Sequence, residues 1–223
     1  MNCVVAIGYR APGVLNNVQV AEMWHTSGTG FFYGKLIHDD PDQSKRLYST
    51  YLVTAKHVIK GYETLQKNDP SVGSMKIRVN QLVQDVGATE FQLLQEIAVP
   101  GAGWIDNPNG KDVSIILVNL TNLRDKKYES AFFSSDTMVA KIDKLRELGT
   151  TAGDGVFVLG FPIDMAGIQK NYVIVRQGVI TRIDELLDHS SDYLMIDAFV
   201  FPGNSGGPVI LRTRILIYKR HKK

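Results

Sequence analysis

The sequence predicts an all-β protein made of two antiparallel β-barrels. Its apolar runs are short, rich in Val, Ile, Phe and Tyr, and interrupted by Gly, Asn, Asp and Pro, which is typical of strands joined by turns. Helical patterns are few, so the strands do not alternate with helices as they would in a parallel βαβ fold. The 223 residues, 44% of them apolar, are enough for one large domain or two small ones.

The expected strands fall into two sets on either side of the polar segment 121–130. The predicted strands cover residues 3–8, 30–36, 47–54, 76–83, 91–99, 113–120, 155–159, 173–176, 178–183, 193–198 and 209–211. One helix is expected over 137–148, where Asp136 can cap and Val139, Ile142 and Leu145 recur at a helical period. We therefore expect an N-terminal barrel over 1–120, a linker over 121–130 and a C-terminal barrel over 131–223.

The formal net charge of +2 conceals an uneven distribution. The residues up to Ser205 carry 19 basic and 23 acidic side chains, a net charge of −4. All six charged side chains after Ser205 are basic: Arg212, Arg214, Lys219, Arg220, Lys222 and Lys223. Such a tail would contact nucleic acid or an acidic membrane only non-specifically, so we expect no specific nucleic-acid partner and no membrane partner.

Cysteine and histidine usage argue against disulfides and metal sites. The single Cys3 excludes an intrachain disulfide, and the other histidines have no spacing typical of metal ligands, so no metal or cofactor is expected. The first twenty residues lack the pattern of a secretory signal, and no run approaches the ~18 apolar residues of a membrane span. A cytoplasmic location is the expectation; the sequence predicts no oligomeric state.

Two segments carry side chains suited to acid–base chemistry. His57 follows the predicted strand 47–54, and histidine is the side chain that exchanges protons near neutral pH. Asp112 directly precedes the apolar strand 113–120, where it can become partly buried and accept a hydrogen bond from an imidazole N–H. Asp106, in the same loop, is the rival acid. Taken alone, each also has an ordinary interpretation as a packed histidine or a turn aspartate.

A third segment, FPGNSGGP over residues 201–208, surrounds Ser205 with glycines. Glycine on both sides of a serine permits a tight turn with positive φ and leaves the hydroxyl accessible. Such a turn can direct the N–H groups of Gly203 and Ser205 at one point, where they would bind a developing oxyanion. The alternative is an ordinary Gly/Pro turn.

Together these segments, TAKHV, DVSIILV and GNSGGP in the order His, Asp, Ser, resemble the trypsin-like (chymotrypsin-fold) serine peptidases. The likeness is greater to the bacterial-type members, including the HtrA (Deg) proteases, and spans roughly residues 28–211. It rests further on GTGFF at 28–32, LGFP at 159–162, VRQGVI at 175–180 and the Asp-Ala pair at 197–198. The resemblance implies six-stranded barrels, Ser205 as nucleophile, His57 as general base, Asp112 as its orienting acid, and an oxyanion hole at Gly203 and Ser205.

The sequence departs from this family at three points. Asn204 replaces the aspartate that pairs with a newly cleaved N-terminus in the digestive enzymes, so we expect no activation of that kind. Phe199 takes the position that forms the floor of the substrate pocket, which disfavours Lys or Arg and favours a small or medium apolar side chain. Only 18 residues follow Ser205, so the second barrel is expected to lack its last strands and one wall of the pocket.

The expected function is therefore a serine endopeptidase that acts on protein or peptide substrates through an acyl-enzyme. Its activity is in question because one wall of the substrate pocket is expected to be missing. Two explanations are open: the reading frame is truncated or frame-shifted, or the chain is a natural short form that a partner completes. The alternative is an inactive pseudo-protease or binding module on the same fold.

Overall fold

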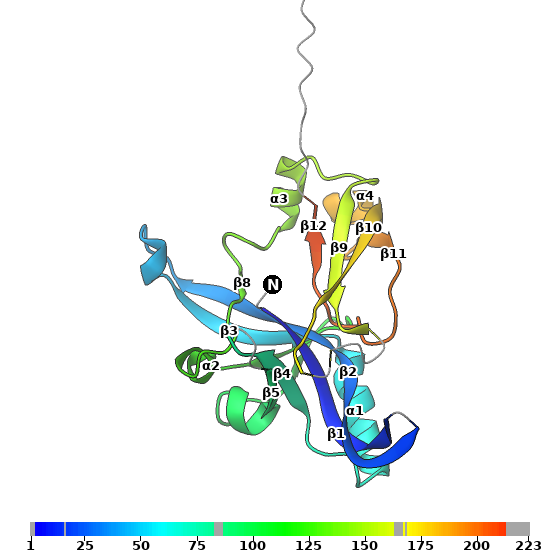
Figure 1. Cartoon of the computed structure of the whole chain (residues 1–223). Helices are drawn as coiled ribbons and strands as arrows, with labels where there is room; N and C mark the ends of the chain where they lie inside the picture. Colours follow the sequence, from blue (N-terminus) through cyan, green and yellow to red (C-terminus); the bar gives the residue numbers. More distant parts are fainter. Residues whose placement is uncertain (1–2, 16, 83–86, 163–166, 168, 213–223) are drawn as a thin grey trace, which may run out of the picture.

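The computed structural model describes residues 3–15, 17–82, 87–162, 167 and 169–212. Two separate sheets make up the molecule, and all pairings but one are antiparallel, which confirms the predicted all-β class. Figure 1 shows the second sheet standing above the first. Residues 213–223, which hold all of the basic tail except Arg212, lie outside the described residues. The predicted loss of the last strands falls there too.

The first sheet has the strand order β5-β4-β1-β2-β3-β7-β6, and β8 pairs in parallel with β2. Its strands are β1 Val4–Leu15, β2 Val18–His38, β3 Leu47–Thr54, β4 Lys76–Asn80, β5 Ala88–Gln92, β6 Ile105–Asp106, β7 Ser114–Leu117 and β8 Phe133–Ser134. Strands β1 and β2 run well beyond the predicted 3–8 and 30–36, because their outer halves form an exposed two-stranded arm without the apolar pattern of a core strand. Register shifts after Ile7 and after Ala11 bend this arm.

The second sheet has the order β11-β10-β9-β12. Its strands are β9 Gly155–Gly160, β10 Ile174–Arg182, β11 Met195–Ala198 and β12 Val209–Leu211. The two strands predicted over 173–176 and 178–183 form one, because Gln177 and Gly178 continue the ladder against Phe157 and Val156. Within the described part of the chain the edge strands β11 and β12 do not pair with each other, so this sheet is open there.

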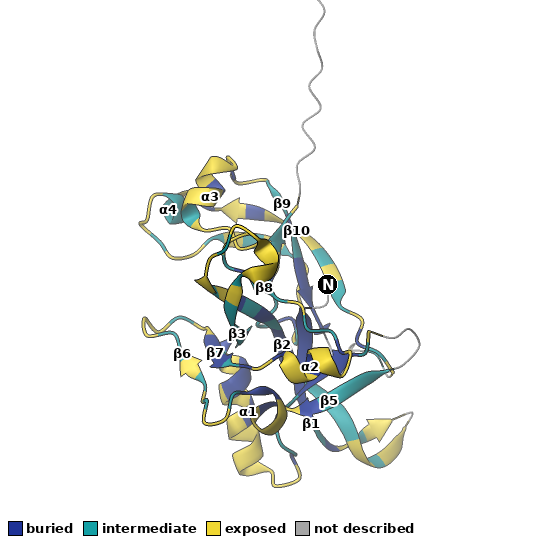
Figure 2. Ribbon diagram, turned by 90° about the vertical axis from the view of Figure 1, so that its left-hand side faces the viewer, coloured by how far each residue is buried: buried dark blue, intermediate teal, exposed yellow. Residues whose placement is uncertain are grey.

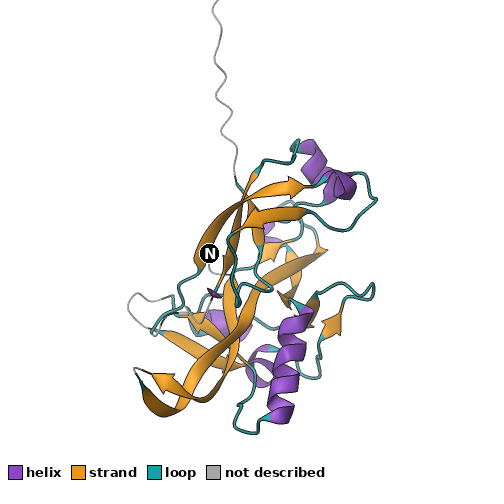
Figure 3. Ribbon diagram, turned by 90° about the vertical axis from the view of Figure 1, so that its right-hand side faces the viewer, coloured by secondary structure: helices purple, strands orange, loops and turns teal. Residues whose placement is uncertain are grey.

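Four α-helices accompany the sheets in the described residues: α1 Lys56–Asn68, α2 Thr121–Asp125, α3 Ile142–Glu147 and α4 Asp184–Leu187. Two further helical turns lie at Gln43–Lys45 and Leu93–Ile97. The second of these takes the place of most of the strand predicted over 91–99, of which only 91–92 belong to β5. The sequence does not predict α1, the longest helix in Figure 3. No described helix has the length and apolar character needed to cross a membrane.

The first sheet with the helices packed on it is called the first unit below, and the second sheet with its helices the second unit. The predicted linker belongs in part to the first unit. Helix α2 forms inside the segment 121–130, and Leu123 is fully buried in the core of the first sheet. Strand β8 then pairs with β2 before the chain enters the second unit. The domain boundaries at 120 and 131 remain a prediction.

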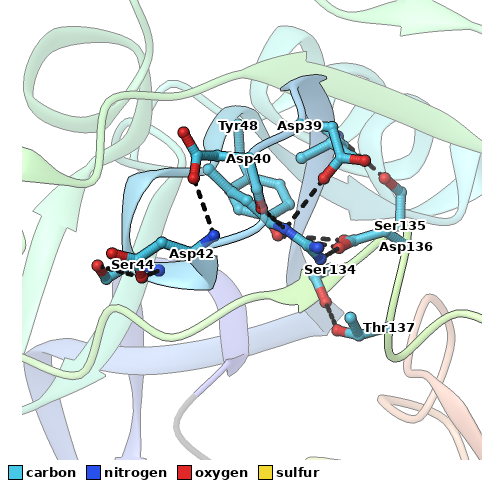
Figure 4. Close-up of polar contacts among 11 residues, drawn as sticks. Asp39, Asp40, Asp42, Ser44, Tyr48, Ser134, Ser135, Asp136 and Thr137 are labelled. Carbon is cyan, nitrogen blue, oxygen red and sulfur yellow. Dashed lines mark hydrogen bonds and ion pairs between the residues drawn. The ribbon is translucent and has the colours of Figure 1, made fainter.

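A polar cluster fixes the segment that leaves the first sheet. Asp136 accepts a hydrogen bond from Arg46 Nη1 at 2.7 Å. It also accepts one from the Tyr48 hydroxyl at 3.2 Å, and Figure 4 shows these two residues beside each other. The Ser135 hydroxyl accepts a hydrogen bond from the Leu36 N–H. Because Asp136 is engaged here, it does not cap a helix, and the helix predicted over 137–148 begins only at Ile142.

Strand β1 divides the interior in two. Val5 and Ile7 point into the large core of the first sheet, whereas Val4 and Ala6 pack with Phe161 of the second unit. The second sheet has a smaller core of its own, formed by Leu145, Val156, Ile180 and Ile183. Figure 2 shows the buried residues gathered in the first sheet and at its contact with β9. This contact brings the turn that holds Ser205 against Thr29 in the middle of β2 and Thr54 at the end of β3.

Candidate active site

His57 lies in the first turn of α1, immediately after β3. Strand β3 ends at Thr54, and Ala55 turns the chain into the helix in an extended conformation (φ −75°, ψ 139°) without a capping side chain. The N–H groups of a first helical turn have no partner within the helix. The His57 N–H finds its partner outside, because it donates to Asp112 Oδ1 at 2.8 Å.

Asp112 holds the same histidine a second time through its ring. Its Oδ2 lies 2.5 Å from His57 Nδ1. A neutral imidazole that donates from Nδ1 has its free lone pair on Nε2, the atom that can accept a proton. The carboxylate therefore fixes both the helix end and the ring that the helix carries.

The surroundings of Asp112 keep it ionised. Partial burial alone would raise the pKa of Asp112, but the hydrogen bonds from the His57 ring and backbone outweigh that effect and hold the pKa below its ordinary value. At neutral pH this carboxylate is available to stabilise a positive imidazolium. Both side chains are more than half exposed, so solvent has access to the pair.

Asp106, the rival acid, has other partners. It accepts a hydrogen bond from the Ser114 hydroxyl at 2.5 Å and forms an ion pair with Lys56 at 2.9 Å. The Ser114 hydrogen bond, followed by the Lys56 contact, lowers the pKa of Asp106. Of the two acids in this loop, Asp112 is the one that contacts His57.

Ser205 lies in the second of two consecutive tight turns, which span residues 201–204 and 204–207. Asn204 N–H donates to the Phe201 carbonyl at 3.1 Å with Gly203 at φ 98°, and Gly207 N–H donates to the Asn204 carbonyl at 2.9 Å with Gly206 at φ 84°. A positive φ at the third position of each turn is the requirement of a type II turn, and glycine meets it without strain. The sequence signal for this turn is thus the placement of its glycines.

The two units meet at this serine. The Ser205 carbonyl accepts a hydrogen bond from the Thr29 N–H at 2.9 Å. A Cβ on Gly206 would lie 2.3 Å from Thr54 Oγ1 and 2.7 Å from the Ala55 nitrogen, so only glycine allows this approach. The serine turn therefore abuts the junction that leads two residues later to His57. No hydrogen bond between the described side chains joins Ser205 Oγ to the imidazole.

The N–H groups of Gly203 and Ser205 donate to no described atom, whereas the carbonyls of both residues are occupied. Unoccupied backbone donors next to a serine are what a developing oxyanion requires. Asn204 between them is buried, and neither polar atom of its side chain has a partner among the described residues.

Phe199 lies on the surface. Its side chain is 75% exposed and contacts the Phe201 ring edge-on at 5.4 Å between centroids. The Arg176 guanidinium lies 5.2 Å from that second ring. No described residue covers Phe199 as a pocket wall would, and its part in substrate binding remains a prediction.

One link beside the site has no local sequence signal. Lys111, adjacent to Asp112, forms an ion pair with Asp192 of the second unit at 3.0 Å and lies over the Tyr193 ring at 4.2 Å. From the sequence alone Asp192 reads as part of a solvated turn, because its partner is distant along the chain. The described residues contain no group of His, Cys, Asp and Glu side chains placed to hold a metal ion.

A model of the trypsin-like peptidase domain matches residues 28–217. The chain belongs to the trypsin-like peptidase family. Membership in the trypsin-like peptidases supports peptide-bond hydrolysis as its activity and proteins or peptides as its substrates. No curated protein matches the chain.

Solved structures similar to this trypsin-like peptidase include the Rv3671c protease from M. tuberculosis. Its inactive and active forms each share 19% identity with this chain at a TM-score of 0.38. The matches cover 94% of this chain and 71% and 65% of those chains. A particular closeness to the HtrA proteases remains a prediction.

Proposed function

We propose that this chain is a serine endopeptidase that uses Ser205 as nucleophile, His57 as general base and Asp112 as the orienting acid. The observation that carries the proposal is the double hydrogen bond from His57 to Asp112. The packing of the serine turn against the β3–α1 junction supports it independently.

In this mechanism His57 Nε2 takes the proton of the Ser205 hydroxyl while Oγ attacks the carbonyl carbon of the peptide bond. The carbonyl oxygen becomes an oxyanion, which the N–H groups of Gly203 and Ser205 bind. One such donor is typically worth about 3–4 kcal/mol of the barrier. The imidazolium, stabilised by Asp112, then protonates the leaving amine, and a water molecule repeats the sequence to release the acyl group.

The exposure of Phe199 favours a second function, a binding module that keeps the fold but does not turn over substrate. A serine peptidase needs a pocket beside its nucleophile, and the described residues leave Phe199 uncovered. Under the first function the apolar ring would disfavour substrates with Lys or Arg at the cleaved bond.

Reaction with diisopropyl fluorophosphate separates the two functions. Folded wild-type protein should gain one phosphoryl group, Ser205→Ala should gain none, and the exposed serine variant Ser71→Ala should react like wild type. Folding of each variant is checked by circular dichroism. Folded wild-type protein that remains unmodified would exclude the peptidase and leave the binding module.

A further inference from the structure

Thr29 of β2 is a fully buried threonine at the meeting point of three segments. Its N–H donates to the Ser205 carbonyl at 2.9 Å, and its hydroxyl donates to the Gly203 carbonyl at 2.7 Å. The same hydroxyl accepts from the Phe161 N–H at 3.0 Å, and the Thr29 carbonyl accepts from the Thr54 hydroxyl at 2.7 Å. Every backbone and side-chain polar group of Thr29 is therefore in use.

The Thr29 hydroxyl is chemically specific for its place. A hydroxyl has one proton to donate and lone pairs to accept with, so it can serve a carbonyl and an N–H at the same time. Valine has nearly the same shape but would leave the Gly203 carbonyl and the Phe161 N–H buried and unpaired, which is costly. Serine would retain both hydrogen bonds.

The carbonyls that Thr29 holds belong to the two residues of the proposed oxyanion hole. Because peptide units are planar, fixing the Gly203 carbonyl fixes the plane it shares with the Asn204 N–H, which is itself bonded to Phe201. Fixing the Ser205 carbonyl fixes the plane that follows the serine. The peptide that carries the Ser205 N–H lies between these two planes, and the peptide that carries the Gly203 N–H directly precedes the first.

Gly160 at the end of β9 makes this arrangement possible. A Cβ at this position would lie 2.8 Å from Thr29 Oγ1 and 2.8 Å from Asn204 Oδ1. A side chain here would displace the hydroxyl from the Gly203 carbonyl. The absence of a side chain at residue 160 is thus part of the same device.

We propose that Thr29 is a positioning residue, which orients the Gly203 and Ser205 N–H groups toward the oxyanion through its hydroxyl. The inference rests on the proposed function of Ser205. Loss of the Thr29 hydroxyl should slow the chemical step and leave the binding of the reagent unchanged, because Thr29 is buried and does not face a substrate.

The test compares Thr29→Val and Thr29→Ser with a matched control, Thr50→Val. Thr50 also donates its hydroxyl to a backbone carbonyl at 2.7 Å, that of Val118, away from the serine turn. With diisopropyl fluorophosphate, the maximal rate of modification of Thr29→Val should fall about 10- to 100-fold at an unchanged half-saturating concentration. Thr29→Ser and Thr50→Val should react at nearly the wild-type rate.

A Thr29→Val protein that reacts as fast as Thr50→Val would overturn the inference. If Thr29→Val does not fold, Gly160→Ala is tested in its place. Its maximal rate of modification should fall by the same factor, and an unchanged rate would overturn the inference. If even wild-type protein does not react, the proposed function fails, and the amide NMR resonances of Gly203 and Ser205 decide the inference. They should shift in Thr29→Val and not in Thr29→Ser or Thr50→Val; resonances unchanged in Thr29→Val would refute the positioning role.

Discussion

The two sheets contribute to the site in different ways. The first sheet surrounds a large core and holds His57 and Asp112 together by direct side-chain contact. The second sheet has a small core and supplies Ser205 on a turn that is hydrogen-bonded to Thr29 and packed against Thr54, two residues of the first sheet. The position of Ser205 is therefore set more by contact between the units than by the packing of its own sheet.

A cavity of about 1130 Å³ between the sheets is a second difference between the two cores. Tyr33 and Val53 on the outer face of the first sheet line one side, and Val156 and Ile180 of the second core line the other. Buried core residues of the second sheet thus reach the wall of this cavity, whereas no described residue of the first core lines it.

The largest effect is expected at the contact within the first unit. In Asp112→Asn the amide can still accept the His57 N–H bond, but its NH₂ group facing the ring would favour the wrong tautomer, so the rate of Ser205 phosphorylation should fall about 10⁴-fold. Asp106→Asn is the matched control, and its rate should stay within about tenfold of wild type. Equal losses in both variants, measured as rates of modification, would remove the distinction between the two acids.

The two cores should differ in how much the free energy of unfolding falls when a buried isoleucine is replaced by alanine. Ile7 of the first core and Ile180 of the second are both almost completely buried, but Ile180 lines the cavity. Ile7→Ala should lower the free energy of unfolding by about 4 kcal/mol and Ile180→Ala by about 2 kcal/mol, because side chains beside an existing cavity can relax more easily around the deleted atoms. Urea unfolding at pH 7 measures both. Equal costs would mean that the second core is as tightly packed as the first.

A smaller loss of stability is expected when one ion pair in each unit is removed. Glu90 on β5 is largely buried and bonds Arg10 at 2.8 Å, whereas Glu185 pairs with Arg182 at 2.7 Å in solvent. Burial alone would raise the pKa of Glu90, but the Arg10 bond and neighbouring positive charges lower it. Glu90→Gln should cost about 2 kcal/mol at pH 7, and Glu185→Gln should change the stability little.

The pH dependence of the Glu90 effect follows from the direction of its pKa shift. A depressed pKa in the folded state contributes stability above the unfolded-state value of about 4.3, and this contribution is lost as the pH falls through the folded value. The stability difference between wild type and Glu90→Gln should therefore be constant near neutrality and shrink below about pH 4. A difference that grows on acidification would contradict the assignment.

The sequence predicts the parts of the site whose signals are local. His57 follows a strand whose bounds are correct, Asp112 precedes an apolar strand, and Ser205 lies between turn glycines. The sequence does not predict helix α1, because Ala55 offers no capping side chain and Gly61 weakens the helical pattern. The apolar residues Val58, Ile59 and Tyr62, which are buried, are the sequence signal for this helix. That pattern places His57 on a helix rather than at a strand end.

What the sequence cannot reveal depends on contacts between distant segments. The four hydrogen bonds of Thr29 join β2 to segments far along the chain, and nothing near residue 29 identifies them. The same holds for Lys111 and Asp192. The exposure of Phe199 likewise depends on what packs over it, which its own neighbours in sequence do not determine.

The most direct test of a single site built from both units is a crystal structure of the protein after reaction with diisopropyl fluorophosphate. We expect phosphorus bonded to Ser205 Oγ, with its phosphoryl oxygen about 2.7–3.1 Å from the N–H groups of Gly203 and Ser205. His57 should remain bonded to Asp112 with Nε2 facing the adduct. An adduct on another residue, or a phosphoryl oxygen turned away from both N–H groups, would contradict this account.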